Sequence, residues 1–157
     1  MIAPLIATAL LAGTGPCTAT EIRASNGMLE GATGTMLGVV YLRNVSQARC
    51  ALGGRPRVRI MTRSHALLVT RERTFALADT GGRPVNALRA GQTAVLHLDW
   101  SNWCGSWVGR IGSFRTLDLR ITLTNTARLT LPIRTGRPRC DAPNLPSSLF
   151  VSTFATS

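Results

Sequence analysis

Acid–base chemistry in this chain would depend on two histidines and seven acidic residues. His97 and Asp99 are two positions apart in segment 93–100, whose alternating apolar and polar residues predict a β-strand. Side chains two apart on a strand share a face, so the pair could act in general acid–base catalysis. No Gly-x-Ser-x-Gly, His-Glu-x-x-His or paired-carboxylate pattern accompanies it. We therefore expect no catalytic residue, and a small secreted hydrolase using His97 and Asp99 is the alternative.

A soft metal ion such as copper is a second chemistry to consider. His65, His97 and Met61 offer imidazole and thioether ligands that suit such an ion. These residues have no close, ordered spacing, and Met28 and Met36 are more simply interpreted as packing residues. We predict no metal and no other cofactor.

Arginine dominates the charge of the chain. All 18 basic residues are arginine, and the formal net charge is +11. Arg55, Arg57 and Arg59 alternate along one side of a short predicted strand, with Arg63 beyond them. Guanidinium groups bind phosphate, sulfate or carboxylate in a bidentate manner. These four arginines are therefore the predicted binding residues.

Two interpretations of the arginines stay open. They could bind an anionic cell-wall polymer, lipid head groups or an acidic protein. Alternatively, a GC-rich genome alone would enrich arginine codons, and the residues would form a solvated outer face. Nucleic acid could use the same charge, but an exported chain rarely meets it, so no nucleic-acid partner is expected.

Three tryptophans, Trp100, Trp103 and Trp107, cluster around Cys104. If exposed, they could stack on sugar rings or anchor a protein contact. If buried, they would cover a disulfide at one end of the fold. We expect Trp100 to be buried, whereas both interpretations stay open for Trp107, which we keep as a binding candidate.

The first residues and the cysteines indicate an exported protein. Residues 1–15 are uncharged and mostly small or apolar, which is typical of an export-signal remnant and too short for a membrane span. The basic beginning of such a signal is missing, so the start of the natural chain could lie upstream. Pro16 replaces the small residue that lipid attachment at Cys17 would need, so a lipid anchor is disfavoured.

The elements that must position these groups are short strands separated by turns rich in Gly, Pro and Asn. In 114–124, residues 117, 119, 121 and 123 are expected to face inward, and Asp118, Arg120 and Thr122 outward. Loops are expected at 26–35 and 101–112, and Asn44 and Ser46 form a turn. A charged break at 71–73 separates two short strands. The expected strands are 18–25, 36–43, 58–62, 66–70, 74–78, 93–100, 114–124, 129–133 and 148–154.

This pattern contains no convincing amphipathic helix and predicts an all-β sandwich formed by one domain, residues 16–157. An even number of cysteines in an exported domain predicts two disulfides, for which three connectivities exist. Strands that run alternately up and down favour Cys17–Cys50 and Cys104–Cys140. Each bridge would close a loop worth about 3–4 kcal/mol in the chain-entropy model.

One stretch of the chain resembles a known family. The spacing Asn44-x-Ser46, then Cys50-x-Leu52-x-Gly54-x-Pro56-x-Val58, resembles the hallmark of the bacterial domain of unknown function 4232. Other segments resemble its further motifs: Gly31-Ala32-Thr33-Gly34, and Leu88-x-Ala90-Gly91-x-x-Ala94 with Trp100, Cys104 and Cys140. The similarity covers about 17–154. Arg55 stands where an aromatic residue is common in the family.

The resemblance implies an immunoglobulin-like antiparallel β-sandwich on an exported or lipid-anchored protein of high-GC Gram-positive bacteria, the actinobacteria. It implies no reaction. Together with the arginines, it leads us to expect an exported, non-catalytic binding or structural module of the cell envelope, with a basic surface suited to anionic envelope components.

Overall fold

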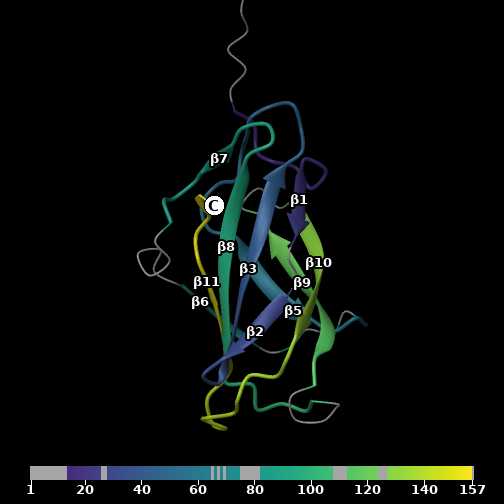
Figure 1. Ribbon diagram of the computed structural model, residues 1–157, viewed down its shortest axis with the longest axis vertical. Coiled ribbons are helices and arrows are strands. Elements are labelled where there is room, and N and C mark those ends of the chain that lie inside the picture. Colours follow the sequence, from purple (N-terminus) through teal and green to yellow (C-terminus); the bar gives the residue numbers. More distant parts are fainter. Residues whose placement is uncertain are drawn as a thin grey trace, which may run out of the picture.

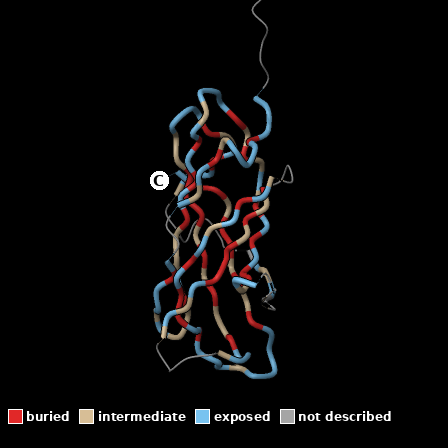
Figure 2. Tube along the Cα trace, turned by 90° about the vertical axis from the view of Figure 1, so that its right-hand side faces the viewer, coloured by how far each residue is buried: buried red, intermediate tan, exposed pale blue. Residues whose placement is uncertain are grey.

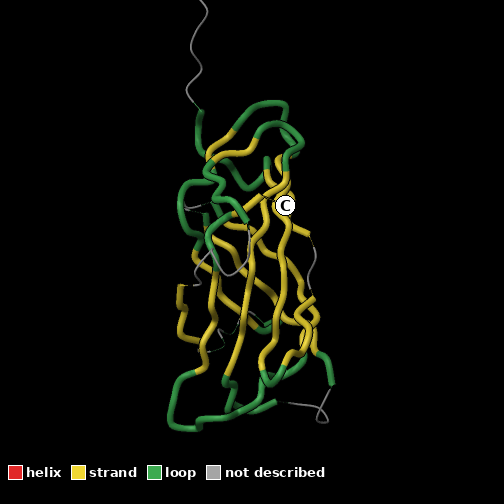
Figure 3. Tube along the Cα trace, turned by 60° about the vertical axis from the view of Figure 1, so that its left-hand side comes forward, coloured by secondary structure: helices red, strands yellow, loops and turns green. Residues whose placement is uncertain are grey.

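The fold is described from a computed structural model that covers residues 14–25, 28–64, 66, 68, 70–74, 82–107, 113–123 and 127–156. Within these residues the secondary structure consists of strands and loops, with no helix (Figure 3). No helix in this part of the chain is long and apolar enough to cross a membrane. The all-β prediction is therefore confirmed, while most of the expected export signal, residues 1–13, lies outside the described residues.

Ten strands join in one sheet, in the order β5-β9-β10-β2-β3-β8-β11-β6, with β1 paired to β3 and β12 to β8. Two further strands, β4 and β7, pair separately. The strands are β1 (Ile22–Ser25), β2 (Met28–Ala32), β3 (Thr35–Asn44), β4 (Cys50–Ala51), β5 (Arg57–Met61), β6 (Thr70–Thr74), β7 (Ala87–Leu88), β8 (Thr93–Ser101), β9 (Arg115–Thr122), β10 (Arg128–Thr135), β11 (Ser147–Val151) and β12 (Ala155–Thr156).

The large sheet curls into a barrel-like shape. Its two end strands, β5 and β6, contact each other, and the backbone N–H of Leu68, just before β6, donates to Ile60 O at 3.1 Å. In Figure 1, β3 and β8 run side by side along one side of the molecule, and β5 and β9 cross behind them. The curled sheet thereby encloses a single core.

Strand direction differs from the purely antiparallel expectation in two places. Strands β10 and β2 pair in parallel, with Arg134 opposite Met28, and β11 and β6 pair in parallel, with Ser147 opposite Thr70. Tight hairpins impose antiparallel pairing, but these strands are far apart in the sequence, and long connections permit either direction. The sheet is therefore mixed.

Buried residues from the strands fill the core, and Figure 2 colours these positions red along the trace. Leu117, Leu119, Ile121 and Leu123 are at most 2% exposed, as the alternation of 114–124 predicts. Trp100 is fully buried, and its indole Nε1–H donates to Ser147 Oγ at 2.8 Å. The expected burial of Trp100 is confirmed.

Two expected loops are strands in the structure. Strand β2 lies within the expected loop 26–35, and β6 runs through the charged break at 71–73, while Ala66 and Leu68 belong to no strand. Pairing of β2 with both β3 and β10 compensates for the poor strand propensity of its glycine and glutamate. β6 is the last strand in the order of the sheet, and charged side chains are common on such edge strands. Residues 75–78 of the other expected strand lie outside the described residues.

The disulfides join Cys17 to Cys50 and Cys104 to Cys140, each with a Cα–Cα distance of 4.8 Å. This is the pairing that the up-and-down strand order favours. The segments that carry the two bridges lie at opposite ends of the long axis (Figure 1). Each end of the curled sheet is therefore tied by one covalent link.

Candidate functional site

The outer surface of β5, β9 and β10 carries a group of arginines, which we call the arginine face: Arg57, Arg59, Arg120 and Arg128. Arg59 on β5 lies opposite Arg120 on β9. Thr122 lies between Arg57 and Arg128 in the next row of the sheet. Because alternate residues share a face, Val58, Ile60 and Ile121 fill the core while the arginines point outward.

The electrostatics of the arginine face favour a bound anion. Residues directly opposite on antiparallel strands have Cβ atoms about 4.5–5.5 Å apart, and like charges there are destabilising. Arg59 and Arg120 occupy such positions, with Arg57 and Arg128 in the adjacent row. An anion placed over this face would offset the repulsion and accept several guanidinium hydrogen bonds.

The neighbouring carboxylates are already engaged. Asp118 Oδ1 accepts a hydrogen bond from Arg63 Nη1 at 3.3 Å, and the Asp118 side chain is only 9% exposed. Asp118 alternates with the core residues Leu117 and Leu119, which agrees with the predicted outward side, but it is buried there and paired with Arg63. Glu72 on β6 lies 3.8 Å from Arg55 Nη2.

Of the four predicted arginines, Arg57 and Arg59 therefore share one open face, whereas Arg55 and Arg63 each pair with a carboxylate. The sequence prediction missed Arg120 and Arg128 as members of this face. The alternation along β9 indicates that Arg120 points outward, but only the pairing of β5 with β9 and β9 with β10 places both residues beside Arg59 and Arg57.

A groove of about 380 Å³ adjoins the arginine face at Arg128. Strand β10 pairs with β2 through Arg134 and Thr135, and the opening lies between the first part of β10 and β1. Its lining includes Arg23 from β1 and Arg128 from β10, with Ile22 and Leu129 among its apolar residues. The groove thus extends the basic surface beyond the flat part of the sheet.

Trp107, the remaining binding candidate, lies at the edge of the core. It is half-buried, and its ring centroid lies 6.1 Å from that of Trp100. The guanidinium of Arg115 lies over the Trp107 ring, 5.3 Å from its centroid. These contacts favour the structural interpretation of Trp107 over stacking on a sugar.

His97 and Asp99 lie on the outer side of β8 and are half-buried. Ser152 lies beside His97 and is fully buried. Its Oγ accepts from the backbone N–H of His97 at 2.9 Å and donates to Thr153 O at 2.7 Å. The Ser152 hydroxyl is therefore bonded to backbone groups and is inaccessible to a substrate.

Desolvation lowers the pKa of His97 and raises the pKa of Asp99, so the neutral form of each side chain is favoured.

The effect of burial on the Asp99 carboxyl can be tested by mutation. Its Oδ1 is buried without a hydrogen-bond partner among the described residues, and burial raises its pKa. A carboxyl whose pKa rises on folding contributes its full stability below its ordinary pKa of 3.8, and that contribution declines as pH rises toward the folded value. Asp99→Asn is therefore expected to raise the free energy of unfolding at neutral pH by less than about 1 kcal/mol, since solvent screens the half-buried group.

Urea unfolding at neutral pH and at a pH well below 3.8 would measure this effect. Asp141→Asn is the matched control, because Asp141 is exposed and paired with Arg139. The stabilisation should appear for Asp99→Asn only and disappear in acid. Equal destabilisation of Asp99→Asn at both pH values would contradict the argument.

The described residues contain no group of three or more His, Cys, Asp or Glu side chains that could hold a metal ion. Of the three ligands considered from the sequence, Met61 is 7% exposed and His97 is half-buried. His65 lies outside the described residues.

Comparison with known proteins identifies the family. A model of the domain of unknown function DUF4232 matches residues 17–154. No curated protein and no solved structure matches the chain. The matched range includes both disulfides and every strand of the large sheet except the last, β12. Because the match covers most of the sequence, the chain belongs to the DUF4232 family.

Proposed function

We propose that this protein is an exported, non-catalytic binding module of the cell envelope, and that its arginine face binds an anionic, phosphate-bearing wall polymer. The observation that carries the proposal is the placement of Arg59 directly opposite Arg120, flanked by Arg57 and Arg128, on an outer sheet surface. The two disulfides are compatible with an extracellular location.

A linear polymer suits the shape of this surface. Neighbouring strands lie about 4.8 Å apart, and alternate residues along a strand are about 6.7 Å apart, so the guanidiniums form a two-dimensional array. The groove between β1 and β10 continues the array with Arg23. A flexible chain of anionic groups can contact several of these arginines at once, and each contact adds to the affinity.

We also propose that the curled sheet is a variant of the immunoglobulin-like sandwich. In support, the β3–β8–β11 side and the β5–β9–β10 side both direct buried side chains into one core, as the two layers of a sandwich do. The function proposed here does not depend on this assignment, because it uses one outer face of the sheet.

The alternative, a small secreted hydrolase that uses His97 and Asp99, has less support. The neighbouring Ser152 is buried and hydrogen-bonded to the backbone, and neither His97 nor Asp99 lines the groove between β1 and β10. A nucleophile close to a histidine and reachable by substrate is what such an enzyme requires.

Binding of the protein to purified cell walls at increasing salt would test the proposal. The arginine-face variant changes Arg57, Arg59, Arg120 and Arg128 to glutamine. The control variant changes four other exposed arginines, Arg71, Arg73, Arg83 and Arg137, to glutamine and has the same net charge. The arginine-face variant is expected to bind about 100-fold more weakly at low salt, because four charged contacts are lost.

Wild-type binding should weaken steeply as salt rises, and walls stripped of their phosphate polymer should retain little protein. The control variant should retain most of the affinity. Equal losses in the two variants, or binding that is insensitive to salt, would show that the arginine face is not the site.

A further inference from the structure

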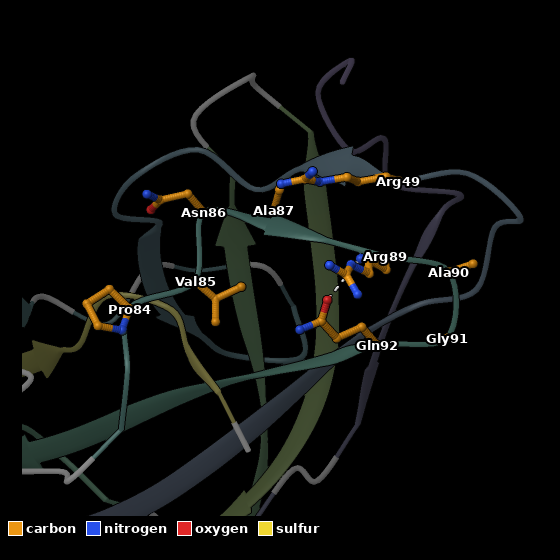
Figure 4. Close-up of a pocket in the computed structure, with 9 residues that line it drawn as sticks. All are labelled: Arg49, Pro84, Val85, Asn86, Ala87, Arg89, Ala90, Gly91 and Gln92. Atoms are coloured by element: carbon orange, nitrogen blue, oxygen red, sulfur yellow. Dashed lines mark hydrogen bonds between the residues drawn. The ribbon is translucent and has the colours of Figure 1, made fainter. Parts of the chain in front are cut away.

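A second basic site lies at the end of the molecule that carries the Cys17–Cys50 bridge. It is an open pocket of about 830 Å³, which we call the Arg49–Arg89 pocket (Figure 4). Its lining includes Arg49 and Arg89, the amides of Asn86 and Gln92, and no acidic residue. A pocket of this size can hold a small organic molecule. The pocket is separate from the arginine face, with which it shares no lining residue.

Arg49 and Arg89 both adjoin the Cys50–Leu88 pair of the β4–β7 ladder. In the pairing of β4 with β7, Cys50 lies opposite Leu88 and Ala51 opposite Ala87. Arg49 directly precedes Cys50, and Arg89 directly follows Leu88. Cys50 and Leu88 are buried in the core, so the alternating residues on either side point to the other face. In Figure 4 both arginine side chains lie at the pocket, Arg49 running toward Ala87 and Arg89 beside Gln92.

One buried side chain fixes the backbone next to both arginines. Asn44 is fully buried, and its Nδ2 donates to Ala48 O at 2.7 Å and to Leu88 O at 3.1 Å. Ala48 directly precedes Arg49, and Leu88 directly precedes Arg89. The Oδ1 of Asn44 accepts from the backbone N–H and the hydroxyl of Ser46, at 2.9 and 2.8 Å. The Asn44-x-Ser46 motif therefore joins the two walls of the pocket.

Further bonds hold the loop that carries Arg89. The backbone of Asn44 accepts from Gly91 N–H at 2.9 Å, and Gln92 Oε1 accepts from Arg89 N–H at 3.0 Å. Gly91 has φ = 72°, a left-handed conformation that glycine adopts without strain. A third arginine, Arg43, has its Nη2 3.9 Å from the position that a Cβ on Gly91 would occupy. The loop thus holds Arg89 in place with further positive charge nearby.

Arg49 and Arg89 line the same pocket, and like charges that share one site repel each other. Their two guanidiniums present up to ten N–H donors in planar forks, a geometry that matches the oxygens of a phosphate group. A bound phosphate would offset the repulsion between them. The pocket is larger than a phosphate ion, so the ligand can carry a further polar group. The amides of Asn86 and Gln92 can form hydrogen bonds with that group.

We propose that the Arg49–Arg89 pocket binds the phosphate group of a small organic phosphate or of a phosphate-bearing head group, and that Asn44 is the positioning residue for both arginines. This site is independent of the polymer-binding face proposed above. The phosphate of the occupant accepts hydrogen bonds from both guanidiniums, and the bonds of Asn44 fix the backbone next to each arginine before the ligand binds.

The test is an NMR and calorimetric titration of the full chain with glycerol 3-phosphate as the probe. Wild-type protein should bind it saturably, with the largest shift changes at residues 48–49 and 86–92. Arg49→Gln and Arg89→Gln should each weaken binding by about tenfold or more, because each removes a charged bidentate contact. Arg137→Gln, an exposed arginine outside both proposed sites, should leave this binding unchanged. Acetate at equal concentration should bind far more weakly.

Absence of saturation at millimolar glycerol 3-phosphate, or unchanged affinity in both pocket variants, would overturn the proposal. Displacement of the probe by phosphatidic acid vesicles would assign the phosphate to a lipid head group. Failure of vesicles to displace it would assign it to a free organic phosphate, and either result requires the pocket.

Asn44→Ala tests the positioning role. It should weaken glycerol 3-phosphate binding at a temperature where the variant is fully folded, while wall-polymer binding through the arginine face stays unchanged. If Asn44 had only a structural role, its loss would weaken glycerol 3-phosphate binding and wall-polymer binding together. If Asn44→Ala does not fold, Arg49→Lys replaces it as the test of geometry. Lysine keeps the charge but loses the planar fork, so the affinity should fall several-fold, and wild-type affinity in Arg49→Lys would contradict bidentate binding.

Discussion

Replacing Trp100 with alanine is expected to lower the free energy of unfolding by about 3–5 kcal/mol. Trp100 is fully buried, and Trp103 and Trp107 pack against it with ring centroids 5.8 and 6.1 Å away. The substitution removes the largest fully buried side chain of the core and leaves a cavity that the tied strands can fill only in part. It also removes the indole N–H that donates to Ser147 Oγ.

Urea unfolding followed by circular dichroism would measure this loss. Trp100→Phe separates the two contributions, because it keeps an aromatic ring but loses the hydrogen bond, and it should cost about 1–2 kcal/mol. Trp107→Ala is the positional control, since Trp107 is only half-buried. A Trp107→Ala loss as large as that of Trp100→Ala would show that the core is not centred where the structure places it.

Removing the Cys17–Cys50 bridge by the double substitution Cys17→Ser/Cys50→Ser is expected to destabilise the protein by about 3–4 kcal/mol. The bridge spans a sequence separation of 33 residues, so its loss restores much freedom to the unfolded chain. Both cysteines are also buried, at 0% and 3% exposure, so the new serine hydroxyls would lie in an apolar environment. Thermal and urea unfolding of the oxidised proteins would measure the difference.

The Cys104→Ser/Cys140→Ser variant is the matched control for this prediction. Its bridge spans a similar separation of 36 residues, so the two entropy contributions should be nearly equal. Cys104 and Cys140 are exposed, and serine there remains hydrated. The Cys17/Cys50 variant should therefore be the less stable of the two. It should also bind glycerol 3-phosphate more weakly, because Arg49 directly precedes Cys50. The reverse order of stabilities would contradict the role given to burial.

Local patterns in the sequence predict some elements well. Strand β9 could be predicted with its inward face, because Leu117, Leu119 and Ile121 alternate with polar residues and need no long-range information. The same holds for β5, where Val58 and Ile60 are buried and Arg57 and Arg59 exposed. Strands β2 and β6 could not be predicted in this way, since their composition favours a loop and only pairing with strands distant in the sequence makes them extended.

In the candidate sites, too, some features follow from the local sequence and others depend on residues that are distant in the sequence. The sequence places Arg57 and Arg59 on one face, but the opposition of Arg59 to Arg120 requires the order of β5 and β9 in the sheet. Asn44 reads locally as a turn residue, and its bonds to Ser46 agree with that. Its bond to Leu88 O joins residues 44 positions apart. No local pattern indicates that contact, and together with the bond to Ala48 O it ties the backbone before Arg89 to the backbone before Arg49.

The contact between β5 and β6 affects how readily the protein can aggregate at high concentration. Free strand edges are where β-proteins add to one another and grow into aggregates. Here the two end strands contact each other, and the groove between β1 and β10 has Arg23 on one lip and Arg128 on the other. A strand of a second molecule placed in this groove would lie between the positive charges of Arg23 and Arg128. Positive charge on both sides of this groove therefore disfavours the addition of a strand from another molecule there.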